Sequence, residues 1–587
     1  MSDDAAKVPF EAEVDRVLDL VINSLYAHRE IFLRELISNA ADACDRLRYA
    51  AIAEPGLLGN DPELKIHVGL DPAAGTLTVA DNGIGMGRDE LAENLGTIAR
   101  SGTARFVQGL SGDRAKDVSL IGRFGVGFYS AFMVADGVTV VSRRAGEEHA
   151  WRWRSDGRTG YTVGEAEGPA PRGTSVTLKL RADAKEFLDG FRVREVVRRY
   201  SDHVPVPILL HQPAAKTGEA APQPEQVNAA SALWTRPRSE VTDEQYREFY
   251  HHVARAFDDP WARLHFRVEG VLSYTALLFV PGARPFDLYD PTRRHGVKLY
   301  VKRVFITDDL EGLLPRYLRF VSGVIDSDDL ELNVSRETLQ HSPVLARVRA
   351  ALVKRLLDEL ARRAKAEDGK YDEFWGNFGA VLKEGIYEDS DNRARLLELA
   401  RFRTTRSDGW VSLAEYRGRM REGQDAVLYI SGESLDALKN SPQLEACRAK
   451  GVEVLLLDDP VDEFWLPEAG AYEGVPFRSL TRGGVDLSGI RAADGGGAAE
   501  PEEPAVGGGE LARLIAVFKG RLGDAVRDVR PSERLTESAV CLVADEHGPD
   551  LRLERFLRQH RQLGALSARV LEINPRHPLI RKLAAMA

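Results

Sequence analysis

A short stretch, residues 32 to 46, holds the residues whose types and spacing could do chemistry, because a helix there would sort its side chains onto two opposite faces. The polar face carries Glu35, Asn39, Asp42 and Arg46. The apolar face carries Leu33, Leu36, Ile37, Ala40, Cys44 and Leu47. A carboxylate and an amide one helical turn apart could act together on a ligand, and the alternative is that both are merely solvated. We predict that this helix lines a binding pocket.

Two glycine-containing loops follow the helix, and their glycines would let the backbone approach a ligand closely. The first is Asp81-Asn82-Gly83-Ile84-Gly85-Met86, and the second covers residues 122 to 128. The carboxylate of Asp81 follows an alternating strand and could accept a hydrogen bond from an exocyclic amine such as that of adenine. The backbone amides around Gly125 and Gly127 could face phosphate oxygens. Either loop alone is more often a simple turn, but with the helix they predict a nucleotide pocket.

The two commonest phosphate-binding motifs are missing from the sequence, since it has no Gly-x-x-x-x-Gly-Lys-Ser/Thr and no Gly-x-Gly-x-x-Gly after a strand. A triphosphate would therefore need another arrangement, such as a magnesium ion with the amide oxygen of Asn39 as one protein ligand. Glu35 would then orient or deprotonate the water that attacks the terminal phosphate. Residues 94–103 and 108–119, between the loops, could move over the pocket as a lid.

A candidate positive charge for the reaction lies far along the chain, in residues 333–340, which follow an acidic run at 326–329. Arg336, supplied from another domain, could neutralise charge on the transferring phosphate and couple hydrolysis to domain closure. The alternative is that this arginine pairs with a nearby carboxylate.

The elements that must position these residues follow from the spacing of apolar side chains. In the first third of the chain, helices precede alternating strands, which predicts helices on one side of an antiparallel or mixed sheet. The strands are expected at 65–70, 76–80, 138–141 and 175–180. Later strands are expected at 276–280, 298–302, 452–457 and 539–544, and helices at 343–365 and 510–522.

Two stretches poor in large apolar residues divide the chain, at 212–231 and, rich in Gly, Ala and Glu, at 485–509. We read both as linkers. The chain is then an α/β protein of three domains, which cover residues 1–211, 232–484 and 510–587, the last being small and α+β.

Composition argues against several classes of protein. A formal net charge of -11 is unlike that of proteins that coat nucleic acid. The sequence has no run of eighteen apolar residues and no charged-then-apolar leader, which argues against membrane spanning and secretion. Its three cysteines, Cys44, Cys447 and Cys541, are far apart and lack zinc or redox spacing. We expect a protein of the reducing cytoplasm.

Together these residues strongly resemble the ninety-kilodalton heat-shock chaperones of the bacterial HtpG type, and through them the gyrase, histidine-kinase and mismatch-repair ATPases. In the ATPase part, the motifs that carry the resemblance are Phe32–Ala40, Asp81–Met86, Asn94–Thr103 and Phe124–Ser130. Further matches lie at 233–236, 285–288, 302–308, 332–337 and 429–434. The resemblance covers nearly the whole chain and is thinner after residue 484.

The resemblance implies a fold, a reaction and a set of site residues. The nucleotide domain would be a curved α/β sandwich, and ATP hydrolysis with Mg2+ would close a homodimeric clamp that remodels client proteins in the stress response, with an Hsp70-type partner. Glu35 would activate water, Asn39 would bind the magnesium ion and phosphates, and Asp81 would contact adenine. The other ATP-binding positions would be Asp42, Arg46, Gly85, Met86, Asn94, Arg100, Gly125, Gly127, Phe128 and Thr174. Residues 96–128 would form the lid, with Arg336 and Gln340 in a catalytic loop of the middle domain.

The sequence departs from the family pattern at a few positions. Arg46 and Arg123 stand where Lys and Gln are usual, and Ala41 stands where Ser is usual, but none of these changes removes a catalytic group. The linker at 212–231 lacks the long charged run of eukaryotic members. The C-terminal dimerisation domain, 510–587, is expected to be shortened.

Two other classes of function stay open beside the ATP-hydrolysing chaperone. One is an ATP-independent holdase, against which Glu35 and Arg336 count. The other is a relative acting on DNA or transferring phosphate to histidine, against which the acidic charge and the lack of a phospho-acceptor histidine domain count. Trp234 and three residues of the last domain could contact clients, although such side chains are more often core. The three are Phe556, Leu557 and Leu563.

Overall fold

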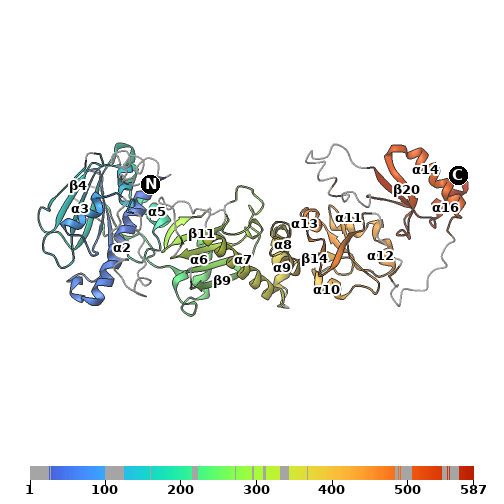
Figure 1. Ribbon diagram of the computed structural model, residues 1–587, viewed down its shortest axis with the longest axis horizontal. Helices are drawn as coiled ribbons and strands as arrows, with labels where there is room; N and C mark the ends of the chain where they lie inside the picture. The colour runs from blue at the N-terminus through green and yellow to red at the C-terminus, as the bar shows by residue number, and fades with distance from the viewer. Residues whose placement is uncertain are drawn as a thin grey trace, which may run out of the picture. The chain divides into compact units, whose positions relative to one another are not determined.

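The structure is a computed structural model (Figure 1). It describes residues 26, 28–98, 125–158, 160–213, 222–270, 273–293, 296–308, 312–328, 330, 343–366, 368–482, 487, 489–490, 505–544, 552, 554 and 568–587. The chain divides into two compact units. Unit 1 comprises Met1–Gly282, Phe286–Leu313 and Val321–Ala350, and unit 2 comprises Ala283–Pro285, Leu314–Phe320 and Ala351–Ala587.

Unit 1 contains an eight-stranded mixed sheet. In spatial order the strands are β5 (Tyr161–Glu165), β4 (Trp151–Ser155), β3 (Ala135–Arg143), β6 (Gly173–Leu180), β2 (Thr76–Asp81), β1 (Ile66–Asp71), β7 (Ile208–His211) and β8 (Glu225–Gln226). All neighbours are antiparallel except β1 and β7, which are parallel. Every second residue of β1 is buried, as expected for a sheet with one covered face. The mixed sheet predicted from the sequence is confirmed.

Helices supply the covering layer of this sheet. α2 (Ile31–Ala53) packs against β1, β2 and α5 (Gly190–Tyr200), and its predicted apolar stripe is buried in the common core. α5 begins where the Asp189 side chain accepts a hydrogen bond from the backbone N–H of Phe191, which satisfies one helix-end donor. The remaining short elements are η1 (Pro55–Leu58), α3 (Arg88–Gly96), η3 (Gly127–Met133) and η4 (Ala182–Leu188).

Part of the stretch predicted to be a linker, 212–231, belongs to the sheet. β8 pairs with β7, and Val227 is buried in the core. The Asn228 side chain accepts a hydrogen bond from the backbone N–H of Ile208 and donates to the carbonyls of Val204 and Val206. The stretch has few large apolar residues, because it is held in the sheet by backbone pairing and by the Asn228 side chain. Its place in the sheet therefore leaves no signal in the sequence. The predicted domain boundaries themselves stay predictions.

Unit 1 also contains a five-stranded sheet, followed along the chain by α7 (Pro343–Ala364). Its order is β12 (Val304–Thr307), β11 (Gly296–Val301), β13 (Ser322–Ser327), β10 (Tyr274–Pro281) and β9 (Pro260–Val268). α6 (Asp243–Ala254) packs on β13, and the short η5 (Leu233–Thr235) and η6 (Arg238–Glu240) precede it. Trp234 is buried, and its indole N–H donates to Asp326 Oδ2 at 2.8 Å. The core interpretation of Trp234 is confirmed, whereas Phe556, Leu557 and Leu563 lie outside the described residues.

The first helical element of unit 2 along the chain is η7 (Arg316–Leu318), and the described residues of this unit form two sheets. The six-stranded sheet has the order β15 (Val411–Ser412), β14 (Arg401–Thr404), β17 (Leu455–Leu457), β16 (Val427–Ser431), β19 (Val475–Ser479) and β18 (Ala471–Tyr472). Its helices are α8 (Lys370–Glu388), α9 (Arg393–Leu399), α10 (Leu413–Gly418), α11 (Leu435–Lys439), η8 (Pro442–Leu444), α12 (Glu445–Ala449) and α13 (Asp462–Ala469). The three-stranded sheet is β20 (Val526–Pro531), β22 (Arg569–Ile573) and β21 (Val540–Val543), with α14 (Gly508–Leu522), η9 (Gly523–Ala525) and α16 (Pro578–Met586).

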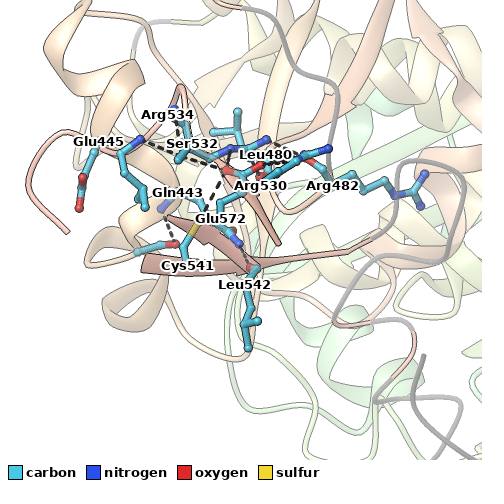
Figure 2. Close-up of polar contacts among 12 residues, drawn as sticks. Gln443, Glu445, Leu480, Arg482, Arg530, Ser532, Arg534, Cys541, Leu542 and Glu572 are labelled. Atoms are coloured by element: carbon cyan, nitrogen blue, oxygen red, sulfur yellow. Dashed lines mark hydrogen bonds and ion pairs between the residues drawn. The ribbon is translucent and has the colours of Figure 1, made fainter. Parts of the chain in front are cut away.

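The two sheets of unit 2 are joined through the segment between β20 and β21 (Figure 2). The Glu445 carboxylate accepts hydrogen bonds from the backbone N–H groups of residues 536 to 538. Arg534 donates to the carbonyls of Leu480 and Arg482, and its Nε lies 2.9 Å from Oε2 of the buried Glu572. A carboxylate held by several backbone N–H groups is a strong local anchor. The C-terminal sheet is therefore fixed to the larger one by charged side chains at both ends of this segment.

All three cysteines are buried and none forms a disulfide. In the part of the chain that the structure describes, no helix is both long and apolar enough to cross a bilayer.

Candidate functional site

Glu35, on the polar face of α2, is buried, which rejects the interpretation that this side chain is merely solvated. The Glu35 side chain is only 2% exposed, and that of Arg34 only 1%. Arg34 donates from Nε and Nη2 to the same oxygen, Glu35 Oε1, at 3.1 and 2.8 Å. A carboxylate away from water keeps its charge only with such a partner. The ion pair therefore gives the Glu35 carboxylate a charged partner inside the domain.

The other oxygen of Glu35 faces the second glycine loop. A Cβ atom placed on Gly127 would overlap Glu35 Oε2, so any other residue there would require the carboxylate to move. Gly127 begins η3, and Gly125 just before it has a φ of 65°. The structure thus brings the catalytic candidate of α2 against the loop predicted to face phosphate oxygens.

The first glycine loop docks on the backbone of α2. The N–H of Ile84 donates to the carbonyl of Ala43 at 3.0 Å, and a Cβ on Gly83 would lie 2.5 Å from the carbonyl carbon of Ala43. Glycine at this position allows a contact that any side chain would block. The two motifs, forty residues apart in sequence, are therefore neighbours in the fold.

Asp81 ends β2 beside this loop. Its register partner on β6 is Thr174, and its Oδ1 accepts a hydrogen bond from the N–H of Gly83 at 2.9 Å. Burial raises the pKa of Asp81 to about 7, against the lowering effect of hydrogen bonds from the backbone at Gly83 and Thr174. A carboxyl group with so perturbed a pKa at the end of a strand is typical of a functional site.

Asn82 and Arg172 hold the Asp81 loop in place. Asn82 Oδ1 accepts from the N–H of Lys65 at 2.8 Å, and its Nδ2 donates to Asp61 Oδ2 at 2.8 Å. Arg172 donates to the carbonyls of Asn82, at 2.9 Å, and Asp61, at 2.7 Å. The loop is thus fixed before any ligand binds, a condition for selective recognition.

Ser142 of β3 links two of the predicted pocket positions, and one of these contacts a third. Its hydroxyl lies 2.8 Å from Thr174 Oγ1 and accepts a hydrogen bond from the N–H of Met86 at 2.8 Å. The Asn94 amide of α3 lies 3.9 Å from Met86 Sδ. Met86, Asn94 and Thr174 are therefore brought together on one side of the Asp81 loop.

Phe128, the remaining predicted position of the second loop, is part of the core below the site. It is buried, and its ring packs against those of Tyr129 and Trp153 with centroids 5.6 and 5.5 Å apart. The neighbouring Tyr129 hydroxyl donates to the carbonyl of Leu95 at 3.0 Å, which ties η3 to α3. We infer no ligand contact for the Phe128 side chain from its burial alone.

The other predicted residues of α2 line the same face. Asn39 is half-buried, Asp42 is buried and Arg46 is half-buried. Burial lowers the pKa of Arg46, while Asp42 and Glu90 act in the opposite direction. Gly85 lies on the Asp81 loop with a φ of 66°. Three predicted site residues, Arg100, Arg336 and Gln340, lie outside the described residues, as does most of the predicted lid, residues 99–124.

Sequence reasoning missed Asn82, Ser142 and Arg172 as parts of the site. Asn82 was visible in the Asp-Asn-Gly motif but was treated as a turn residue. Ser142 carries a weak signal, since it is a polar residue on a strand whose alternate positions Val138 and Val140 are buried. Arg172 has no sequence signal that we can identify, because all its partners lie about a hundred residues away.

Comparison with known proteins agrees with this geometry. The family model described as "Histidine kinase-, DNA gyrase B-, and HSP90-like ATPase" matches residues 16–161, and the one described as "Hsp90 protein" matches residues 211–587. The chain belongs to the Hsp90 family. It is a molecular chaperone with an ATPase domain.

Individual members of the Hsp90 family match this chain over almost its full length. It is 57% identical to Chaperone protein HtpG of Paramagnetospirillum magneticum over 579 residues, which are 99% of this chain and 91% of that protein. It is 56% identical to Chaperone protein HtpG of Rhodospirillum rubrum, with 98% and 92% covered, and 51% identical to that of Roseobacter denitrificans, with 98% and 90% covered. The resemblance to this family predicted from the sequence is confirmed.

Proposed function

We propose that this Hsp90-family chaperone hydrolyses ATP with Glu35 as the residue that activates water, Asn39 as the ligand of a magnesium ion and of phosphates, and Asp81 as the acceptor for the adenine amine. The observation that carries the proposal is the placement of Glu35. One carboxylate oxygen is held by Arg34, and the other faces Gly127 in the loop beside which a phosphate would lie. A base fixed next to a phosphate-binding loop is what attack by water on a terminal phosphate requires.

Magnesium fits the donors that are available. Among the described residues there is no group of three or more His, Cys, Asp or Glu side chains that could hold a metal ion. A cation would thus take most of its ligands from phosphate oxygens and water, with one amide oxygen from Asn39, as suits magnesium. When bound, the ion would neutralise charge on the phosphates. The residues of this chain would position the water and the adenine.

The remaining predicted residues belong to the same proposal. Asp42, Arg46, Gly85, Met86, Asn94, Arg100, Gly125, Gly127, Phe128 and Thr174 would surround the nucleotide. Arg336 and Gln340 would reach the terminal phosphate from the middle domain, so that closure and hydrolysis are coupled. We further propose that the chain works in the cytoplasm as a homodimer on client proteins with an Hsp70-type partner.

The decisive experiment compares ATP turnover and ATP affinity of the wild type with those of Glu35→Ala. We expect turnover to vanish while the dissociation constant for ATP stays within about threefold, because the carboxylate acts on water and not on the nucleotide. Turnover that survives in the variant would contradict the role of Glu35. If the wild type itself shows no turnover above the variant, the holdase alternative takes its place.

Dimerisation is tested by measuring turnover per chain across a wide range of chain concentrations. A homodimeric clamp predicts that turnover per chain rises with concentration and then levels off. A value that is independent of concentration, together with a monomer mass in sedimentation, would contradict the proposed clamp. The Glu35→Ala variant supplies the background at each concentration.

A further inference from the structure

Tyr200, the last residue of α5, lies between the Arg34–Glu35 ion pair and the five-stranded sheet. It is buried, and its ring centroid is 5.9 Å from Arg34 Cζ, within the range of a cation–π contact. The ring of Phe305 on β12 lies 5.9 Å from the same ring. One aromatic side chain thus touches both the partner of the catalytic candidate and a strand of the other sheet.

The orientation of Tyr200 is fixed by a buried carboxylate. Its hydroxyl donates to Glu30 Oε1 at 2.7 Å, and Arg199 donates to the same oxygen at 3.1 Å, while Arg192 pairs with Oε2. Burial acts to raise the pKa of Glu30, but the hydrogen bond from Tyr200 and the charges of Arg192 and Arg199 outweigh it and lower that pKa. Glu30 directly precedes α2, so the ring is tied to the same helix that carries Arg34 and Glu35.

The turn of the β11–β12 hairpin is fixed to β13 of the five-stranded sheet. Its turn residues Lys302 and Arg303 both have positive φ, of 52° and 65°. Arg303 is fixed by its N–H, which donates to Asp326 Oδ1 at 3.1 Å. The hairpin that carries Phe305 is therefore held in the five-stranded sheet, and it contacts α5 through the ring of Tyr200.

We propose that Tyr200 is a positioning residue for ATP hydrolysis, which holds Arg34, and through it Glu35, in an orientation set by Phe305 of the β11–β12 hairpin. The inference rests on the proposed role of Glu35. Because Tyr200 acts on the ion pair and not on the nucleotide, its loss should reduce the rate of hydrolysis and leave nucleotide binding almost unchanged. A small displacement of a general base is enough to slow its reaction strongly.

The test uses the full chain and compares Tyr200→Leu with Tyr200→Phe. The leucine removes the ring from between Arg34 and Phe305, whereas the phenylalanine keeps the ring and loses only the hydroxyl. We expect kcat to fall about tenfold in Tyr200→Leu with KM and the ATP dissociation constant within about twofold, and to stay within about threefold of wild type in Tyr200→Phe. Equal kcat in Tyr200→Leu and wild type overturns the proposal.

Two further variants separate a positioning role from a general loss of stability. Phe305→Leu removes the ring on the hairpin side of Tyr200. It should lower kcat and leave KM unchanged, as Tyr200→Leu should. It can therefore replace Tyr200→Leu in this test if that variant folds poorly. Phe249→Leu removes a ring that packs on the same core near Trp234 and Phe279, away from Arg34, and should lower the melting temperature without changing kcat. If Phe249→Leu slows hydrolysis as much as Phe305→Leu does, the effect is only structural and the proposal fails. If Glu35→Ala still hydrolyses ATP, the proposed function fails instead.

Discussion

Asp81 has an unusually high pKa for a carboxyl group, and it is also the proposed contact to adenine. In the ligand-free protein, burial raises the pKa of its carboxyl group to about 7, so near neutral pH the residue is partly protonated. Only the ionised form has both oxygens available as acceptors for an amine. Nucleotide affinity should therefore depend on pH in a range where most carboxylates are fully ionised.

We predict that ATP binds about tenfold more weakly at pH 6 than at pH 8, because one pH unit below its pKa only about a tenth of Asp81 is ionised. ATP affinity is lost as pH falls through about 7, because protonation of Asp81 removes one of its two acceptor oxygens. Calorimetric titration of ATP at several pH values measures the effect. Asp81→Asn should bind weakly at every pH and lack this dependence, and an affinity for wild type that is flat between pH 6 and 8 would contradict the prediction.

The contact between Gly127 and Glu35 gives a second prediction. Gly127→Ala should lower ATP turnover at least about tenfold, because the new methyl group would overlap Glu35 Oε2 and displace the carboxylate. The matched control is Gly164→Ala on β5, where nothing lies within 4 Å of the added Cβ. ATP turnover assays on both variants test this prediction. Equal activity of Gly127→Ala and Gly164→Ala would show that the contact between Gly127 and Glu35 does not affect hydrolysis.

At this scale, local sequence patterns indicate some of the residues that lie together, but they do not indicate residues whose partners are distant in the sequence. Glu35, Gly127, Asp81 and Thr174 were predicted, and the structure brings each against a predicted neighbour. Ser142 was missed because its importance depends on β3 and β6 lying side by side, which no local pattern specifies.

Among the elements, α2 shows most clearly what periodicity can and cannot predict. The apolar stripe and its helical spacing were correct, and the helix is observed over Ile31–Ala53. The same pattern did not reveal that the polar face is covered as well, because the covering loops follow at Asp81 and Gly127, far along the chain. β4 and β5 were not predicted, and β17 is shorter than the predicted strand 452–457.

The helices α8 and α13 are joined by a buried ionic cluster that is important for the stability of unit 2. Lys383 is buried, and its ammonium group donates to Asp459 at 2.7 Å and to Asp462 at 2.8 Å. Burial acts to lower the pKa of Lys383, but the charges of Asp462 and Asp459 more than compensate and raise it. The cluster is costly to break because a charge would be left buried without its partner.

We predict that Lys383→Ala lowers the free energy of unfolding by about 3–5 kcal/mol, the usual range when one partner of a buried ion pair is removed. Chemical denaturation followed by circular dichroism measures the change. The control is Lys439→Ala, which removes the partner of the exposed Asp408 and should leave the unfolding midpoint unchanged. Similar midpoints for Lys383→Ala and wild type would contradict the prediction.

For the whole molecule, acid sensitivity follows from the histidines of unit 1. Burial lowers the pKa of His67, His203 and His265, so each is neutral in the fold and more easily protonated in the unfolded chain. The contacts of His265 fit a neutral ring, since one ring nitrogen is 2.7 Å from the Tyr246 hydroxyl and the other 2.8 Å from the Trp234 carbonyl. Such groups stabilise the protein above their unfolded pKa, near 6.5, and that stability is lost as pH falls through the folded values.

We predict that the three buried histidines make unit 1 less stable at pH 5.5 than at pH 8, an effect that Asp81 opposes over the same range because its pKa is raised to about 7. The variant His265→Gln should reduce the difference between the two pH values. His149→Gln, at a largely exposed histidine, should leave the difference unchanged. Denaturation curves of the three proteins at both pH values measure this effect, and a change in stability between the two pH values that is the same for His265→Gln and wild type would refute the assignment.

The overall organisation was predictable in outline. The order of helices and strands indicated an α/β protein, and the structure contains four sheets within the described residues. The role of residues 225–228 could not be predicted, because a two-residue strand and one buried asparagine leave no periodic pattern. The fold class can be predicted from composition and from the spacing of apolar residues. Contacts between segments that are distant in sequence depend on tertiary packing, which the sequence pattern does not specify.

The position of β6 in the first sheet has a consequence for biosynthesis. β6 lies between β2 and β3, and β7 pairs with β1, so the strand beside Asp81 is translated about ninety residues after Asp81 itself. While the ribosome is still adding residues up to His211, the strands already made have unpaired edges. The nascent chain therefore cannot form a finished nucleotide pocket until this late segment has emerged, and its early strands need protection from aggregation until then.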